Sequence, residues 1–140
     1  MKPYLLLILS LILKLPAFAQ HEPIRSGQHA FTLQWIDLDK HGPGLVMIQS
    51  LGENKYSIEG EQRDKTKKEY ITIKGTIVAD DESLYFDGKI VSKVGFVNNG
   101  KPCEMSGPAV FKAVGKRRYW RLQRMMNCDG ISSDYIDIYF

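Results

Sequence analysis

The chain has 140 residues, of which 19 are basic and 16 acidic, and 44% are hydrophobic. This length allows one domain with a sizeable core rather than several domains. A net charge of +3 is small for a general nucleic-acid binder, which usually carries a strong basic excess. We therefore expect no nucleic-acid partner.

The first nineteen residues have the three parts of a secretory signal peptide. Lys2 gives a positive start, residues 4–13 form an apolar run, and Ala17-Phe18-Ala19 matches a small-x-small cleavage site. The apolar run is too short to cross a bilayer about 30 Å thick. No second run of this kind follows, so we expect no integral membrane span. Cleavage at residue 19 predicts a secreted or periplasmic protein, and the sequence does not distinguish these two compartments.

Residues 20–28 are polar and predict a loose leader, and residues 29–140 predict a single all-β domain. Apolar and polar residues alternate with the period of two that is typical of half-buried strands. No ten-residue stretch has the apolar spacing of a helix. We predict eight or nine strands, at residues 30–36, 45–50, 55–60, 70–79, 83–86, 89–97, 109–114, 117–125 and 134–140.

Short strands at regular spacing indicate an antiparallel up-and-down meander that closes into a small barrel, with a β-sandwich as the alternative. The dipeptide Asp87-Gly88 is typical of a two-residue hairpin turn. Residues 98–108 predict a long loop. Gly115-Lys116 predicts a tight turn that places Phe111 opposite Trp120, with both rings in the core.

The chain has two cysteines, Cys103 and Cys128. In an exported protein such a pair is most simply a disulfide. Successive connections of a meander alternate between its two ends. The predicted loops that carry these cysteines are two connections apart, so they belong to the same end, where a bridge is geometrically easy.

Aromatic and basic residues give the candidate binding residues. We expect Trp35, Phe111 and Trp120 to face the interior and Arg118 to lie at the barrel mouth, where it can receive an anionic group or stack on a ring. Tyr119 and Arg121 fall on the outer face and are candidate surface contacts. Arg121 is expected to pair with an acid such as Asp137 on the last strand.

Catalytic and metal-binding motifs are missing from the sequence. It has no Gly-x-Ser-x-Gly elbow, His-Glu-x-x-His helix or phosphate-binding loop. The histidines His21, His29 and His41 lack the spacing of metal ligands. These observations favour a non-catalytic protein without a metal or cofactor, although catalytic residues that meet only in space would escape such a search.

The chain resembles small lipocalin-like or avidin-like barrels, also called calycin-like. The resemblance rests on the architecture, on Trp35 in "TLQWI" and on Arg118 or Arg121 in "RRYWRLQ". Lipocalins pair a first-strand Trp with a late-strand Arg, and the resemblance implies a barrel that holds a small ligand. The chain is equally similar in size to small exported barrel inhibitors of lysozyme or proteases. Its C-terminal pattern is similar to small exported bacterial proteins with no assigned role.

Three functions follow from these observations. The first is an exported, non-catalytic barrel that binds a small apolar or anionic ligand. The second is a protein-binding module, such as an inhibitor of a secreted hydrolase, that uses loops held by the disulfide. The third is a structural component of the cell envelope. A small-molecule ligand or a secreted protein is therefore the expected partner.

Overall fold

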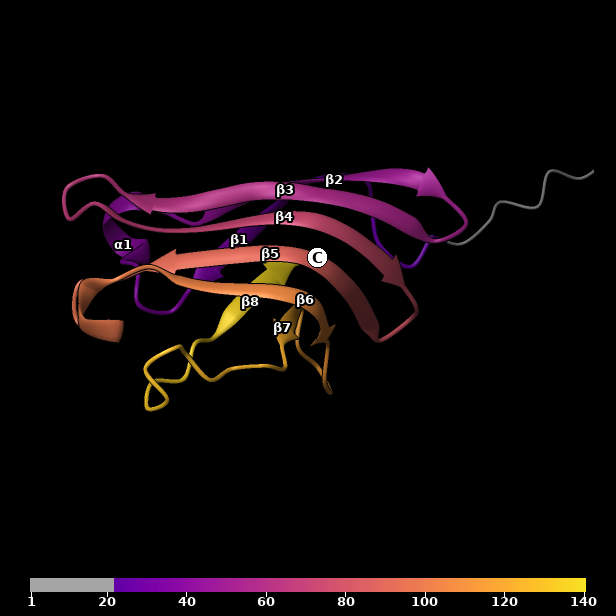
Figure 1. The fold of residues 1–140 in the computed structure, drawn as a ribbon. Helices are drawn as coiled ribbons and strands as arrows, with labels where there is room; N and C mark the ends of the chain where they lie inside the picture. The colour runs from indigo at the N-terminus through magenta and orange to yellow at the C-terminus, as the bar shows by residue number, and fades with distance from the viewer. Residues whose placement is uncertain (1–21) are drawn as a thin grey trace, which may run out of the picture.

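Eight antiparallel strands, each paired with the next along the chain, close into a barrel when β8 pairs with β1 (Figure 1). The computed structural model describes residues 22–140, and the predicted signal peptide at residues 1–19 lies outside them. The predicted all-β meander and small barrel are confirmed, rather than the alternative sandwich. The strands are β1 Gly27–Leu33, β2 Gly44–Gly52, β3 Lys55–Asp64, β4 Glu69–Ala79, β5 Ser83–Lys93, β6 Cys103–Lys112, β7 Tyr119–Leu122 and β8 Ile136–Tyr139, with a short helix α1 Leu38–His41 and a 3₁₀ turn η1 Asn98–Gly100.

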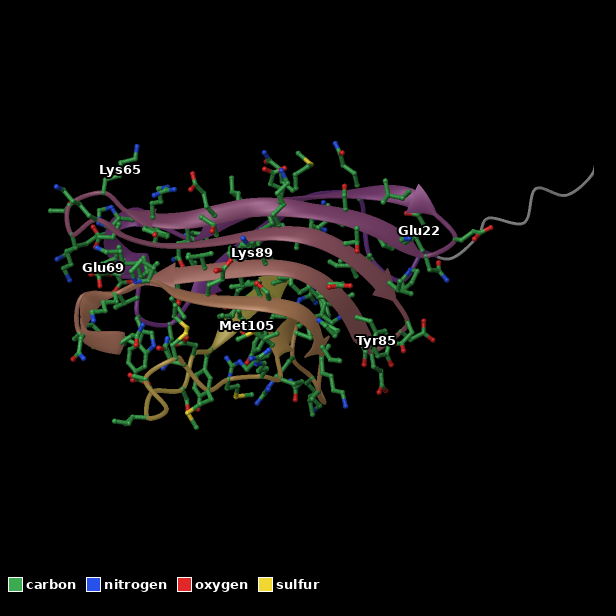
Figure 2. The ribbon with its side chains drawn as sticks, viewed as in Figure 1. Glu22, Lys65, Glu69, Tyr85, Lys89 and Met105 are labelled. Atoms are coloured by element: carbon green, nitrogen blue, oxygen red, sulfur yellow. A yellow bond between two sulfur atoms is a disulfide. The ribbon has the colours of Figure 1, made fainter. Side chains whose placement is uncertain are left out.

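The barrel has two ends with different contents. Figure 2 shows Lys65 and Glu69 at one end and Glu22 and Tyr85 at the other. We call the first the disulfide end, because the β5–β6 connection and the β7–β8 connection meet there through Cys103 and Cys128. We call the other the terminal end, because Pro23 and Phe140 line one pocket there.

Side chains that alternate along each strand fill the barrel interior. Burying such apolar surface is the main stabilising term of the fold. Short side chains are needed where strands approach closely, and long ones fill the middle. The buried core consists of Ile24, Phe31, Leu33, Ile36, Val46, Ile48, Tyr56, Ile58, Ile71, Ile73, Ile77, Ala79, Leu84, Phe86, Ile90, Val94, Val97, Phe111, Trp120, Leu122, Ile136 and Ile138.

The predicted hairpin at Asp87-Gly88 is wrong, because β5 continues through it without a turn. Gly88 pairs with Gly75 of β4 and with Gly107 of β6. A Cβ atom on Gly88 would lie 2.2 Å from the carbonyl oxygen of Lys74, so no other residue fits this position without a shift of the backbone. Glycine here allows close approach of neighbouring strands in a small barrel, which is its usual role inside a strand.

The connection between β6 and β7 is also longer than predicted. It spans residues 113–118 instead of the two-residue turn Gly115-Lys116. Phe111 pairs with Leu122, whereas the tight turn would have paired it with Trp120. This difference in register is two residues, and a shift of two keeps each side chain on the same face. Phe111, Trp120 and Leu122 are therefore all buried, as predicted.

β6 begins at Cys103, so the loop predicted at residues 98–108 is shorter than expected. β6 pairs with β5 from Cys103 to Lys112, but it pairs with β7 only at Phe111 and Lys112. The long β7–β8 connection runs beside the rest of β6 (Figure 1). The disulfide fastens this connection to the start of β6, where a strand-to-strand ladder is missing.

Residues 22–28 are not the loose leader that their polarity predicts. Ile24 is 1% exposed and belongs to the core, and β1 already begins at Gly27. The buried ring of His29 also ties this segment to β8. Its Nε2 lies 2.6 Å from the carbonyl oxygen of Arg25, and its Nδ1 lies 2.6 Å from that of Tyr139. The barrel domain therefore includes at least residues 24–28.

Candidate functional site

The two most exposed large apolar side chains of residues 22–140 lie at the disulfide end. Ile131 is 86% exposed and Phe96 is 69% exposed. Phe96 lies on the β5–β6 connection and Ile131 on the β7–β8 connection. Single exposed apolar residues are common on protein surfaces, whereas groups of them mark interaction sites. Whether the two side chains act together depends on what holds their loops in place.

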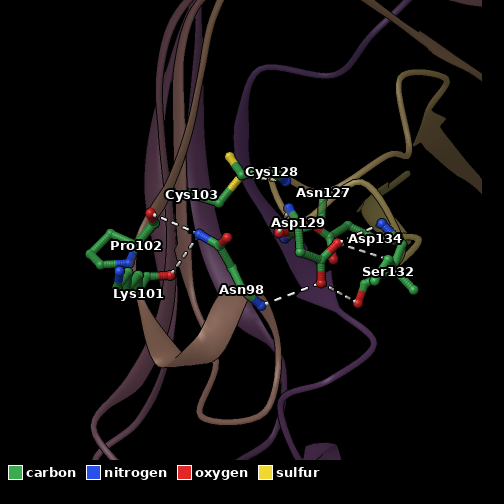
Figure 3. The surroundings of a disulfide bond; sticks show 10 residues. Asn98, Lys101, Pro102, Cys103, Asn127, Cys128, Asp129, Ser132 and Asp134 are labelled. Atoms are coloured by element: carbon green, nitrogen blue, oxygen red, sulfur yellow. Dashed lines mark hydrogen bonds between the residues drawn. A yellow bond between two sulfur atoms is a disulfide. The ribbon is translucent and has the colours of Figure 1, made fainter.

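Asp129 joins the two loops by accepting hydrogen bonds from both (Figure 3). Within its own loop it accepts from the N–H of Ser132 at 2.8 Å, from the N–H of Ile131 at 2.9 Å and from the Ser132 hydroxyl at 2.7 Å. From the other loop it accepts from the N–H of Asn98 at 3.4 Å. The bonds from Ser132 and Ile131 are the main cause that lowers the pKa of Asp129 to about 2. Asp129 thus stays ionised and keeps its bonds at neutral pH.

The Trp35 ring packs against the Phe96 ring. The two rings meet edge to face with centroids 5.4 Å apart. The Trp35 indole Nε1 donates to Asp134 at 3.0 Å, and Asn127 donates to the other oxygen of Asp134 at 2.7 Å. Asp134 and Asn127 are both buried. Phe96 therefore rests on a ring whose orientation is set by a buried hydrogen-bond network.

The predicted disulfide between Cys103 and Cys128 is confirmed, with Cα atoms 5.6 Å apart. The N–H of Cys128 also contacts the Sγ of Cys103 at 3.2 Å. The bridge, Asp129 and Asp134 together tie the β7–β8 connection to β6, to the β5–β6 connection and to the segment after β1. The two exposed apolar residues are thus presented by loops with few free conformations, which reduces the entropy cost of binding.

Arg121 and Asp137 form the pair that the sequence predicts, on the outer face of β7 and β8. The guanidinium donates from Nε and Nη2 to the two carboxylate oxygens at 2.8 Å each. The guanidinium also lies 4.3 Å from the ring centre of Tyr135 and 5.1 Å from that of Tyr119. The pair is mostly buried. The Arg121 guanidinium is therefore bound to Asp137 and packed against the rings of Tyr119 and Tyr135.

The structure does not bring the four predicted ligand-binding residues together. Trp35 lies at the disulfide end. Phe111 lies in the core against Phe86, with ring centres 6.0 Å apart. Arg118 is exposed at the terminal end, where its carbonyl oxygen accepts from the N–H of Phe140. No arginine of residues 22–140 stacks on Trp35, so the lipocalin-type pairing of Trp with Arg is not formed.

Trp120 lines a pocket. The pocket lies at the terminal end, has a volume of about 250 Å³, and includes apolar and charged side chains. The Trp120 ring packs against Phe140, with centroids 4.3 Å apart. The lining residues are Pro23, Ile24, Arg25, His29, Asp81, Trp120 and Phe140.

Sequence reasoning missed Phe96, Ile131 and Asp129. Phe96 follows an apolar run and looks like part of a buried strand. The stretch from Asp129 to Ser132, "DGIS", does contain the Asp, Gly and Ser that favour turns in which a side chain bonds its own backbone. That signal predicts an ordered turn, but it does not predict that Ile131 faces solvent.

Within the described part of the chain, no three His, Cys, Asp or Glu side chains gather in a way that could hold a metal ion. Residues 22–140 also contain no helix of the length and apolarity needed to cross a membrane.

Comparison with known proteins gives one family. Residues 19–140 match the model of the PM1083 family. An uncharacterized protein, PM1083 of Pasteurella multocida (strain Pm70), is 42% identical over 116 residues, which cover 81% of this chain and 72% of that protein. No solved structure matches the chain. The chain therefore belongs to the PM1083 family.

Proposed function

We propose that this barrel is a non-catalytic protein-binding module that uses its disulfide end, and that its partner is a secreted or periplasmic protein such as a hydrolase that it inhibits. One observation carries the proposal. The two most exposed large apolar side chains, Ile131 and Phe96, stand on two loops that the disulfide and Asp129 lock together. Large apolar side chains on a rigid surface are typical of the central contacts of protein interfaces.

Export is part of this proposal. Residues 1–19 have the composition of a signal peptide, and the family match begins at Ala19. A disulfide between the only two cysteines is typical of an oxidising compartment. Together these observations support a mature protein that acts in the periplasm or outside the cell.

The proposal predicts that a partner captured from the exported proteins of the source cell depends on Phe96 and Ile131. The double variant Phe96→Ser/Ile131→Ser should lose at least about 30-fold in affinity for that partner, since the loss of even one central interface residue costs about 2 kcal/mol or more. Capture by the immobilised full chain, followed by titration in a biosensor, measures the change. Because both residues are exposed, the melting temperature should change little.

A matched control uses Val78→Ser/Tyr85→Ser. These two side chains are each 49% exposed and lie directly opposite one another on β4 and β5. This control should leave capture unchanged. If both double variants captured the partner as well as the unaltered chain, the disulfide end would not be the binding surface. If no exported protein bound at all, a structural envelope role would become the better explanation.

A second candidate function is the binding of a small ligand in the pocket at the terminal end. The pocket combines the Trp120 and Phe140 rings with Arg25, so it suits a small apolar molecule that carries an anionic group. Its volume of about 250 Å³ is below the 300–1,000 Å³ or so of typical drug-sized sites. The core side chains fill the barrel beneath it, so a ligand would bind at the mouth rather than inside.

Benzoate is a suitable test molecule for this pocket. The sequence has two tryptophans, Trp35 and Trp120. In a Trp35→Phe variant the tryptophan fluorescence therefore comes from Trp120 and reports on the pocket. Binding predicts a saturable change with benzoate that weakens in Arg25→Gln and is smaller with uncharged benzamide. A linear, non-saturating response would exclude this ligand class.

A further inference from the structure

The turn between β3 and β4 gives the disulfide end a strong positive charge. It carries Lys65, Lys67 and Lys68, all exposed. Figure 2 shows Lys65 at the tip of this hairpin and Glu69 at its base, near the end of β5. These three lysines have no salt-bridge partner within residues 22–140.

Below the tip, three outward side chains form a row across neighbouring strands. Arg63 of β3 pairs with Tyr70 of β4, and Tyr70 pairs with Lys93 of β5. The Arg63 guanidinium lies 5.0 Å from the centre of the Tyr70 ring. This row and the hairpin tip line an open surface hollow of about 430 Å³, which we call the basic hollow; its lining residues are Arg63, Asp64, Lys65, Lys68, Glu69, Tyr70 and Lys93.

The two carboxylates of the basic hollow are buried and already accept hydrogen bonds from the protein. Asp64 accepts from the N–H groups of Thr66 at 3.0 Å and Lys67 at 3.2 Å, and lies 3.2 Å from His41 Nε2. Burial opposes ionisation of Asp64, but these hydrogen bonds and the nearby His41 outweigh it and lower the pKa of Asp64. Glu69 accepts from the N–H of Gly95 at 2.9 Å. The charge that the hollow offers to a ligand is therefore mainly positive.

The bond from Gly95 to Glu69 also fixes where the basic hollow lies. Gly95 directly precedes Phe96, so the residue with the exposed ring follows one that is bonded to the lining of the hollow, and both belong to the disulfide end. The disulfide end thus carries both an apolar contact and a cationic contact. Interfaces commonly combine an apolar centre with charged groups that steer the partner.

We propose that the basic hollow binds carboxylates of an acidic segment of the protein partner, beside the apolar contact made by Phe96 and Ile131. This inference rests on the proposed function and specifies the chemistry of the partner. The Lys68 and Lys93 ammonium groups suit single carboxylates that enter this concave site. Arg63 lies beside them and already pairs with Glu61. A lipid surface is flat and would engage the exposed lysine tip without filling the hollow.

Nuclear magnetic resonance with the ¹⁵N-labelled full chain tests this site with a defined molecule, the blocked peptide acetyl-hexaglutamate amide. We expect saturable shifts in the amide signals of residues 63–70 and of Lys93. Affinity should fall at least about tenfold in Lys68→Glu/Lys93→Glu and should also fall as salt increases, because exposed charges are screened.

The matched control is Lys74→Glu/Lys89→Glu, which makes the same change in net charge elsewhere on the same sheet. Lys74 lies 3.7 Å from Glu59, and Lys89 lies 2.7 Å from Glu104, so these lysines already have partners, in exposed pairs that contribute little stability. This variant should bind the peptide as the unaltered chain does. An equal loss in both variants would reduce the effect to net charge and overturn the site.

Two further titrations, with inorganic phosphate and with phosphatidylglycerol vesicles, distinguish a carboxylate ligand from other anions. Inorganic phosphate or phosphatidylglycerol vesicles that shift the same signals, while the peptide does not, would overturn the proposal in favour of a phosphate group or a lipid surface. The peptide experiment needs no captured partner, so it can succeed even if capture through Phe96 and Ile131 fails. Conversely, a partner whose capture is unaffected by Lys68→Glu/Lys93→Glu would keep the proposed function and overturn this inference.

Discussion

Trp120→Ala is expected to lower the free energy of unfolding by about 3–5 kcal/mol, the range measured for large aromatic residues removed from cores. Trp120 is 5% exposed, packs on Phe140 and lies beside the buried ring of His29. Its removal leaves a cavity at the terminal end, where β7 begins. Urea unfolding followed by circular dichroism measures the loss.

Tyr85→Ala is the control for this prediction. It also removes an aromatic ring from a strand, but Tyr85 is half exposed on the outer face of β5. We expect a cost below about 1 kcal/mol, since exposed substitutions usually have small effects. A Trp120→Ala cost as small as that of the control would contradict the packing described above.

The double variant Cys103→Ser/Cys128→Ser is expected to lose about 3.5 kcal/mol of stability. The bridge spans 25 residues, and chain-entropy arithmetic for a loop of this length gives that value. The reason is specific to this barrel: β6 and β7 pair through only two residues, so the covalent bond replaces much of a missing ladder. Guanidinium unfolding of the oxidised chain and of the double variant gives the difference.

The unaltered chain treated with a reducing agent should lose about the same amount of stability, which separates loss of the bridge from any effect of the serines. Reduction should also weaken capture through Phe96 and Ile131, because the loops would gain conformational freedom. Equal stability of the oxidised and reduced chains would mean that the buried hydrogen bonds of Asp134 hold the connection without the bridge.

The architecture could be predicted from the sequence because each barrel strand has its own alternation of apolar and polar residues. The inward Ile71, Ile73 and Ile77 alternate with polar residues, and this alternation alone predicts β4. The disulfide followed from the presence of two cysteines in a chain expected to be exported, and the topology agreed with it because alternate connections of a meander share an end. The pairing of Arg121 with Asp137 could also be predicted, because the alternation places each of them on the outward face of neighbouring strands.

The errors arose where a local signal competed with distant contacts. Asp87-Gly88 has the composition of a hairpin turn, but Gly88 is needed for the close approach of Lys74 and Gly75 on the neighbouring strand β4. The candidate site was missed for a related reason. The pattern around Phe96 is that of a buried strand, and only the path of the β5–β6 connection places the ring in solvent.

The positions of Pro23, near the start of the described residues, and of Phe140, the last residue, have a practical consequence for how the protein can be displayed. Pro23 and Phe140 meet in one pocket at the terminal end, at the opposite end of the barrel from Phe96 and Ile131. A tether, a fusion or an immobilising tag at either end would leave the disulfide end facing away from the support. In the same way, a barrel held near another surface at Pro23 would present its apolar loops and its lysine hairpin outward.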